Sequence, residues 1–380
     1  MKKYTGLLFG AIVLWMGCQE RPADRPIGSF SQYDINLPPP PPRDQQLIEH
    51  LALKSIYDAT DLPHVGPHCS WFEVACDADG YVIGLQLGTT PVDFHEDDFQ
   101  KALSSQIGNL IYLKRLVLVS SNLTSLPPEI GNLTNLTSLT IREARLTSLP
   151  PEIGKLVNLL ELHVTQNQLI SIPSEIESLT KLRILDLALN KLELIPSEIG
   201  ELINLTSLNL NYNQLNLLPN SIENLSMLEE IFISHNLFTS MPEEIWKLTE
   251  LKRLIINNNH LAFALPKAIG NLTRLMTLMA GGNQLLALPV EMKKLTSLEI
   301  LDISDNLFSV VPVGILNLTK LRFLHLEENE LSVLPADIER LILLQYLNVS
   351  NNNLYDTRLP DALNDRYANA LMTYISMPQH

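Results

Sequence analysis

The chain has 380 residues and a formal net charge of −15, with 27 Lys and Arg against 42 Asp and Glu. Phosphate binding needs clustered basic residues, so this balance argues against a nucleic-acid partner. Hydrophobic residues make up 46% of the sequence but aromatic residues only 6%, which predicts an interior built mainly from Leu and Ile.

The first 18 residues, MKKYTGLLFGAIVLWMGC, carry two lysines, an apolar run from Leu7 to Met16, and then Gly17 and Cys18. About ten apolar residues are too few to span a bilayer, which needs roughly twenty. The order is typical of a secretory signal peptide. The stretch LWMGC resembles a bacterial lipoprotein signal, which implies a cleaved segment 1–17 and a lipid attached at Cys18. An ordinary cleaved signal that leaves a spare cysteine is the alternative.

Residues 18–43 are polar, lack an apolar period and contain five consecutive prolines at 38–42. Such a segment buries too little surface to fold, and its prolines favour an extended conformation. It predicts a tether that holds a folded domain away from a membrane. A proline-rich ligand for an aromatic groove is the alternative.

The remaining cysteines, Cys69 and Cys76, lie in the stretch CSWFEVAC. An even pair in an oxidising compartment favours a disulfide. A metal site would need four ligands, and no second Cys/His cluster accompanies His64 and His68. We therefore expect an N-terminal cap with a disulfide and no metal over residues 44–107.

Residues 108–357 contain eleven units that align on LxxLxLxxNxL, 23 residues apart except for one step of 24. Their ninth positions are Ser121, Ala144, Asn167, Asn190, Asn213, Asn236, Asn259, Asn283, Asn306, Asn329 and Asn352. The second half of each unit reads LPxxIxxL. This period and pattern are the signature of leucine-rich repeats. In such an array each unit packs only on its neighbours, so one core extends along the whole length.

Each unit predicts a short strand followed by a short helical turn. Alternate strand residues point to opposite faces, so the leucines face inward and successive strands stack into a parallel sheet. The ninth-position Asn is expected to be buried and to satisfy its amide against the backbone of its own and adjacent turns. Pro is expected at the first helical position, with an acidic residue two positions later at the positive end of the turn.

The repeats resemble the 23-residue LPxxIGxL type of the leucine-rich repeat family, as in Ras-group repeat proteins. The segment CSWFEVACDADGYVIGLQL resembles the N-terminal cap of extracellular plant repeat proteins, with Glu73 in place of the usual glycine. The resemblance implies an α/β solenoid capped at both ends, with a curved parallel sheet on the concave face and helical turns on the convex face. It also implies that Cys69 pairs with Cys76 and that a protein partner binds the concave face.

The stretch LPDALNDRYANALMTYI departs from the repeat near the end of the chain. Leu363, Tyr367, Leu371 and Tyr374 follow a helical spacing there. They predict a closing helix within residues 358–380.

The central outward strand position varies from unit to unit, and three consecutive units place Phe232, Ile255 and Met279 there. Grouped apolar residues on a surface are typical of a binding site. Tyr212 and His235 occupy a nearby outward column, Gly281–Gly282 remove side chains beside Met279, and the extra residue in HLAFALP falls in the same region. We expect a partner-binding hot spot centred on Tyr212, Phe232, His235, Ile255 and Met279. A few isolated apolar residues on a large surface are the alternative.

Catalytic motifs are missing from the sequence: it has no phosphate-binding glycine loop, no HExxH and no GxSxG. His163 and Asp186 hold the same outward position in adjacent units, and without a nucleophile we interpret them as a surface pair. An acidic group shares the concave side of the last units, where a solvated acidic end is favoured over a cation site. Its members are Asp302, Asp305, His325, Glu327 and Glu328.

The sequence therefore predicts a non-catalytic protein-binding module, monomeric and without a cofactor or metal. It would be exported and held by its lipid in a bacterial outer membrane or at the cell surface, or secreted if the signal is an ordinary one. Two other functions stay open. One is a structural or adhesive surface protein, glycan binding included, without one specific partner; the more remote one is a hydrolase.

Overall fold

The computed structural model describes residues 43–58, 66–71, 73–88, 103–119, 122–355 and 373–375. The predicted signal peptide, Cys18 and the tether up to residue 42 lie outside these residues. Arg43, assigned to the tether from sequence, is already the first residue of helix α2. Within the described part of the chain, no helix combines the length and the apolar character that crossing a bilayer requires.

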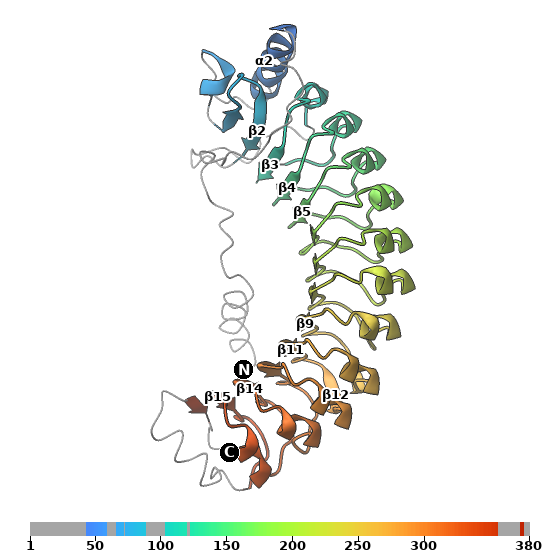
Figure 1. The fold of residues 1–380 in the computed structure, drawn as a ribbon, viewed down its shortest axis with the longest axis vertical. Coiled ribbons are helices and arrows are strands. Elements are labelled where there is room, and N and C mark those ends of the chain that lie inside the picture. The colour runs from blue at the N-terminus through green and yellow to red at the C-terminus, as the bar shows by residue number, and fades with distance from the viewer. Residues whose placement is uncertain are drawn as a thin grey trace.

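The described residues form a curved solenoid with strands on its inner edge and helical turns on its outer edge (Figure 1). A 14-stranded sheet follows the inner edge, and neighbouring strands place residues one repeat apart side by side, as Leu208, Ile231 and Leu254 do. Every described pairing in this sheet is parallel except that of β1 with β2. This confirms the predicted α/β solenoid. Its strands are β1 Val74–Cys76, β2 Val82–Leu87, β3 Arg115–Val119, β4 Ser138–Arg142, β5 Glu161–Thr165, β6 Ile184–Asp186, β7 Ser207–Asn209, β8 Glu230–Phe232, β9 Arg253–Ile255, β11 Thr277–Met279, β13 Ile300–Asp302, β14 Phe323–His325, β15 Tyr346–Asn348 and β16 Thr373–Ile375.

The helical turns are short 3-10 helices. Each repeat's proline stands one place before the helix, at the N-cap, and not at its first position as predicted from sequence. An extended backbone at this proline, φ −68° and ψ 150° at Pro219, leads the chain into the turn. The helices are η1 His68–Ser70, η2 Ser105–Asn109, η3 Pro128–Asn132, η4 Pro151–Lys155, η5 Ser174–Ser178, η6 Ser197–Glu201, η7 Asn220–Asn224, η8 Glu243–Lys247, η9 Lys267–Asn271, η10 Val290–Lys294, η11 Val313–Asn317 and η12 Ala336–Arg340.

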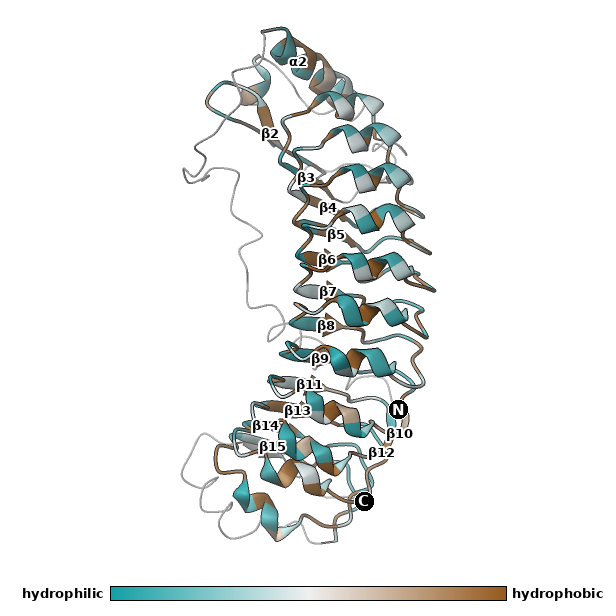
Figure 2. Ribbon diagram, turned by 45° about the vertical axis from the view of Figure 1, so that its right-hand side comes forward, coloured by the Kyte–Doolittle hydropathy of each residue, from teal (hydrophilic) through white to brown (hydrophobic). Residues whose placement is uncertain are grey.

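One continuous hydrophobic core runs between strands and turns, from Ala52 in α2 to Leu354 in the last repeat. It consists mostly of leucines and isoleucines that are fully buried at the repeat positions. Figure 2 shows hydrophobic residues on strands such as β5 and β6 and hydrophilic residues over much of the helical turns. The core lengthens by one layer per repeat, because each layer packs only on its neighbours.

The ninth-position asparagines form a buried ladder beside the core. The side chain of Asn236 donates to the backbone oxygens of Leu210, Ile233 and Ser234, and its own oxygen accepts from the amide of Leu215. The same pattern recurs from Asn190 to Asn329. Because Leu210 and Leu215 belong to the preceding repeat, each asparagine joins two turns, as predicted.

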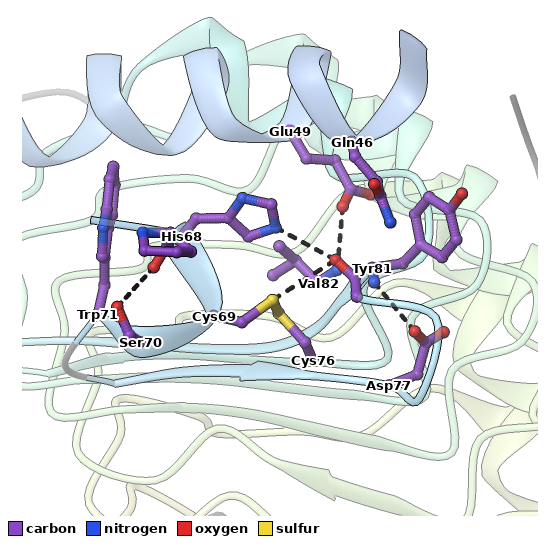
Figure 3. Close-up of a disulfide and its surroundings, with 12 residues drawn as sticks. Gln46, Glu49, His68, Cys69, Ser70, Trp71, Cys76, Asp77, Tyr81 and Val82 are labelled. Carbon is purple, nitrogen blue, oxygen red and sulfur yellow. Dashed lines mark hydrogen bonds between the residues drawn. A yellow bond between two sulfur atoms is a disulfide. The ribbon is translucent and has the colours of Figure 1, made fainter. Parts of the chain in front are cut away.

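The N-terminal cap closes one end of the core. Helix α2 (Arg43–Asp58) buries Leu53, Ile56 and Tyr57 against it, and the ring of Trp71 lies 5.1 Å from that of Tyr57. A disulfide joins Cys69 to Cys76 below this helix (Figure 3). The covalent link fixes η1 to the end of β1.

Glu49 of α2 is fully buried over this cap, and its Oε2 accepts a hydrogen bond from the backbone amide of Val82 at 3.0 Å (Figure 3). Its Oε1 has no hydrogen-bond partner among the described residues. Burial raises the pKa of Glu49 to about 7, although the Val82 hydrogen bond acts in the opposite direction. The cap thus contains a carboxyl group that titrates near neutral pH.

The closing segment differs from the sequence prediction where it is described. A helix was expected within residues 358–380, but Thr373–Ile375 form strand β16, which pairs in parallel with β15. These residues therefore continue the sheet by one strand, whose hydrogen bonds satisfy the edge of β15. The rest of the predicted helix, 358–372 and 376–380, lies outside the described residues.

Candidate binding site on the concave face

Two columns of side chains point outward along the concave strands. The central column is set by the strand register, and from β7 onward it comprises Asn209, Phe232, Ile255, Met279, Asp302, His325 and Asn348. Two residues further along each unit lies the second column, which comprises Asn211, Ser234, Asn257, Gly281, Ser304, Glu327 and Ser350. Backbone hydrogen bonds between adjacent repeats continue through this second column, so its members also lie side by side.

Tyr212 and His235 form a face-to-face stack beside these columns, with ring centroids 4.0 Å apart and planes 10° from parallel. Tyr212 is 46% exposed, whereas His235 is half-buried. Burial lowers the pKa of His235, so its ring is neutral at neutral pH. An exposed aromatic pair of this kind offers a rigid, partly apolar contact surface.

Phe232 lies next to this stack in the central column and is half-buried. The guanidinium carbon of Arg253 lies 5.0 Å from the centre of its ring, a cation–π geometry. Arg253 also pairs with Glu230 at 3.4 Å, and Glu230 accepts a hydrogen bond from Ser207 at 3.1 Å. The strand side chains on either side of Phe232 therefore hold the ring in place.

Ile255 and Met279 do not form the exposed apolar surface expected from sequence. Both point outward, since they are excluded from the core cluster that contains their neighbours Leu254 and Leu278, yet they are only 4% and 7% exposed. Strands in a sheet lie about 4.8 Å apart, and concave curvature brings the side chains of neighbouring strands closer still. Of the five predicted hot-spot residues, Tyr212, His235 and Phe232 remain accessible, and Ile255 and Met279 pack beneath their neighbours.

The extra residue of the 24-residue unit also lies elsewhere than predicted. Strand β10 (Ala262–Ala264) pairs with β12 (Gln284–Ala287) in a separate sheet, and their register shifts next to Phe263. Figures 1 and 2 place this pair on the far side of the repeats from the concave strands. Phe263, which is 74% exposed, is therefore no part of the candidate site.

The His163–Asp186 pair fits the interpretation as a surface pair. The Nδ1 atom of His163 lies 3.8 Å from an Asp186 oxygen, which is within ion-pair range but beyond a hydrogen bond. Both side chains are partly exposed in adjacent strands.

The acidic end of the concave face is only partly solvated. Asp305 and Glu328 are exposed, but Asp302 and Glu327 are only 4% and 7% exposed. Burial opposes protonation of His325, yet its hydrogen bond to Glu327 and the charges of Asp302 and Glu327 raise its pKa overall. The expectation of a freely solvated acidic end is therefore wrong for Asp302 and Glu327.

Metal-ligating atoms come together at one place among the described residues. His68, Cys69 and Cys76 have potential ligand atoms within 4.8 Å of one another. The two sulfurs are joined in the disulfide and so cannot act as thiolate ligands. The carboxylates of Asp302 and Glu327 do not gather with a third ligand in this way.

Comparison with known proteins agrees with this geometry. A leucine-rich repeat region model matches residues 93–171, and two further leucine-rich repeat models match residues 296–354 and 204–225. A leucine-rich repeat protein of Leptospira interrogans is 32% identical, with 73% of this chain and 82% of that chain covered and a TM-score of 0.52. The chain belongs to the leucine-rich repeat family. No curated protein matches this leucine-rich repeat protein.

Two other solved structures resemble this leucine-rich repeat protein. An internalin from Listeria monocytogenes is 26% identical, with 73% of this chain and 77% of that chain covered and a TM-score of 0.63. The plant peptide hormone receptor RGFR1, solved in complex with RGF2, is 30% identical with a TM-score of 0.60. That match covers 67% of this chain but only 42% of the receptor. The fold is thus one that serves as a protein-binding module.

Sequence reasoning placed Glu327 on the concave side but missed Ser234 and Asn257 beneath the concave surface. Ser234, Asn257 and Glu327 of the second column each carry a buried oxygen without a hydrogen-bond partner among the described residues. The signal in the sequence was their shared phase, two residues after the central position of each unit. This shared phase does not tell which side-chain oxygens accept a hydrogen bond, because the hydrogen bonds depend on side-chain rotamers across several repeats.

Proposed function

We propose that this leucine-rich repeat protein is a non-catalytic recognition module that binds another protein on its concave face. The observation that carries the proposal is the accessible aromatic group of Tyr212, His235 and Phe232, held by neighbouring side chains on the concave strands. Aromatic residues dominate the energetics of protein interfaces, and rigid ones lose little entropy on binding. The receptor–hormone complex of similar fold supports a protein ligand.

The test is affinity capture with the tagged full chain from the organism's own extract, followed by mass spectrometry. We expect a discrete partner whose recovery falls at least tenfold with Tyr212→Ala and with Phe232→Ala. Met227→Ala is the matched control, because Met227 is an exposed apolar residue in the turn between η7 and β8. Equal recovery with all three variants, or only diffuse salt-sensitive association, would favour the structural or adhesive alternative.

The proposed location is outside the cytoplasm, where a lipid on Cys18 would hold the repeat domain at a membrane. The proposal is supported by the signal-like first 18 residues and the proline-rich stretch that follows. Metabolic labelling with a clickable fatty acid should label the wild-type chain and not Cys18→Ser, and only the wild type should partition into detergent. Identical partitioning of both would instead favour a secreted protein.

The proposed stoichiometry is one chain per particle, since α2 covers the N-terminal end of the solenoid's core and β16 extends the sheet beyond β15 at the other end. Light scattering of the purified chain should give the mass of one chain. A dimer mass that is lost together with partner binding would assign the concave face to self-association.

A further inference from the structure

We propose that the concave face between Asn257 and Glu327 binds a basic segment of the protein partner, with arginine or lysine side chains directed at Asp302 and Glu327. This inference rests on the proposed function and names the chemistry of the partner. It depends on buried acceptor oxygens that lack donors, on a gap in the second column, and on the local charge.

The first part of this subsite spans three strands. The side-chain nitrogen of Asn257 donates to Oδ2 of Asp302 at 3.1 Å, although Asn257 lies two residues after β9, Asp302 ends β13, and β11 lies between these two strands. They meet because Gly281 provides no side chain at the intervening second-column position. A Cβ atom on Gly281 would lie 3.0 Å from Asp302 Oδ1 and 2.8 Å from Ser304 Oγ. The glycine thus leaves a gap between the side chains of the second column, and the Asp302 carboxylate and the Ser304 hydroxyl lie at that gap.

The acceptors around this gap have unused capacity. Oδ1 of Asn257 is buried and lacks a hydrogen-bond partner among the residues that the structure describes. Leaving a buried polar atom unpaired costs free energy, and native proteins rarely do so without a ligand, a water or a functional reason. A partner that brings N–H groups into the gap would satisfy this oxygen while contacting the Asp302 carboxylate.

Glu327 supplies a second, independent acceptor in the neighbouring repeat. Its side chain is 7% exposed, Oε1 lies 3.4 Å from His325 Nδ1, and Oε2 has no partner within the described residues. His325 lies beside Asp302 in the register of β13 and β14, and its Nδ1 approaches Glu327, so the two carboxylates flank the same histidine. A buried carboxylate oxygen without a donor is costly, and a cationic N–H group is its strongest partner.

The negative charge of this region favours a positively charged ligand. From Asn257 to Asn351 the central column, the second column and the residue that follows the second column in each unit carry four carboxylates and one histidine. They are Asp302, Asp305, Glu327, Glu328 and His325. Exposed Asp305 and Glu328 flank the buried pair and would attract a basic segment as it approaches. A metal ion fits less well, because these ligand atoms do not converge as those of the cap cluster do. Arginine and lysine heads carry several N–H donors and can reach acceptors that lie further apart.

The probe is the peptide acetyl-Gly-Arg-Gly-Arg-Gly-amide, because alternate residues of an extended chain face one side. Its matched control carries citrulline, which keeps the shape of arginine but has no charge. Binding to the full chain is followed through the methionine methyl signals, with Met279→Leu assigning that of Met279, at about 150 mM salt so that exposed charges are screened. We expect the citrulline peptide to bind at least tenfold more weakly. Equal affinity of both peptides, or no binding of the arginine peptide, would overturn the proposal.

The variants separate the buried pair from the exposed one. Asp302→Asn and Glu327→Gln should each weaken the arginine peptide at least fivefold, whereas Asp305→Asn and Glu328→Gln should change its affinity less than twofold. Far-ultraviolet circular dichroism and the melting temperature confirm that each variant is folded. Equal losses of peptide affinity in the buried and the exposed pair would show that the peptide binds a diffuse acidic surface and would overturn the proposed subsite. Displacement of the peptide by millimolar Ca²⁺ in the wild type but not in Asp302→Asn would reassign the site to a metal ion.

The proposed function and this inference can fail separately. If the captured partner depends on Tyr212 and Phe232 but binds Asp302→Asn and Glu327→Gln as well as wild type, only the basic-segment subsite is wrong. If the arginine peptide binds as expected but no protein is captured, the subsite stands and the recognition function does not.

Discussion

The ring of Tyr212 stacks on the ring of His235 in the next repeat, and both residues have left-handed backbones, with φ of 56° and 54°. The same backbone conformation recurs one place before the ninth position of most described repeats. It turns the side chain at that position along the solenoid, so that neighbouring rings can meet face to face. Repetition of an unusual backbone angle therefore builds the most accessible aromatic surface of the concave face.

The Tyr212–His235 stack should contribute measurable coupling to stability. A double-mutant cycle with Tyr212→Ala and His235→Ala is expected to give about 0.5–1 kcal/mol, the usual range for an aromatic pair. Urea unfolding at pH 8, where His235 is neutral, measures it. Tyr212→Phe should retain the coupling because it keeps the ring. A coupling indistinguishable from zero would mean that the rings are adjacent without stabilising each other.

The asparagine ladder should be the most sensitive polar feature of the repeats. Asn236→Ala removes three donated hydrogen bonds and one accepted one and leaves buried backbone groups unpaired. We expect the free energy of unfolding to fall by about 2–4 kcal/mol. Asn220→Ala is the control, because Asn220 is exposed at the start of η7, and its effect should be within about 0.5 kcal/mol. Similar effects of the two substitutions would contradict the role of the ladder.

At exposed positions with a left-handed backbone, a better-suited residue should increase the stability of the fold. Gln166 has φ 54°, and asparagine tolerates this region better than glutamine, so Gln166→Asn should stabilise by about 0.5 kcal/mol. The same substitution at exposed Gln214, whose φ is not positive, should not increase the free energy of unfolding.

Gly282→Ala should destabilise by more than about 1 kcal/mol, because φ is 65° and the new Cβ would lie 2.5 Å from Asn258 Oδ1. Thermal unfolding of the three variants and the wild type measures these differences in stability.

Glu49 should make the stability of the N-terminal cap depend on pH. Its folded pKa of about 7 lies above the value of 4.5 in the unfolded chain, so the native state binds the proton more tightly. The contribution is fully present below pH 4.5 and is lost as pH rises through 7. The free energy of unfolding should fall by on the order of 2 kcal/mol between pH 5 and pH 8.

Glu49→Gln isolates this effect, because an amide oxygen can still accept the Val82 hydrogen bond but cannot titrate. Urea unfolding of both proteins across pH 5–8 should give a flatter profile for the variant. The raised pKa of His325 gives a slope of the same sign in both proteins and cancels in their difference. Parallel profiles would show that Glu49 keeps an ordinary pKa.

Much of the fold could be predicted because it depends on which residue types recur at fixed positions of each repeat. Apolar residues such as Leu208 and Ile231 recur at positions that one strand and one turn direct inward, whatever lies elsewhere in the chain. The ladder was predictable for the same reason, since Asn236 bonds only to backbone atoms whose positions the repeat itself sets. Strand β16 was missed because its sequence lacks the repeat pattern, and only pairing with β15 makes it a strand.

The candidate site was less predictable, because accessibility depends on neighbours in several repeats at once. The alternation of strand residues determined that Phe232, Ile255 and Met279 point outward. Only the tertiary structure decided that Ile255 and Met279 are covered, that Gly281 lets Asn257 reach Asp302, and that Glu327 keeps an oxygen without a donor. Direction is a local property of the backbone, whereas burial and hydrogen bonding on a curved sheet depend on the side chains that curvature brings together.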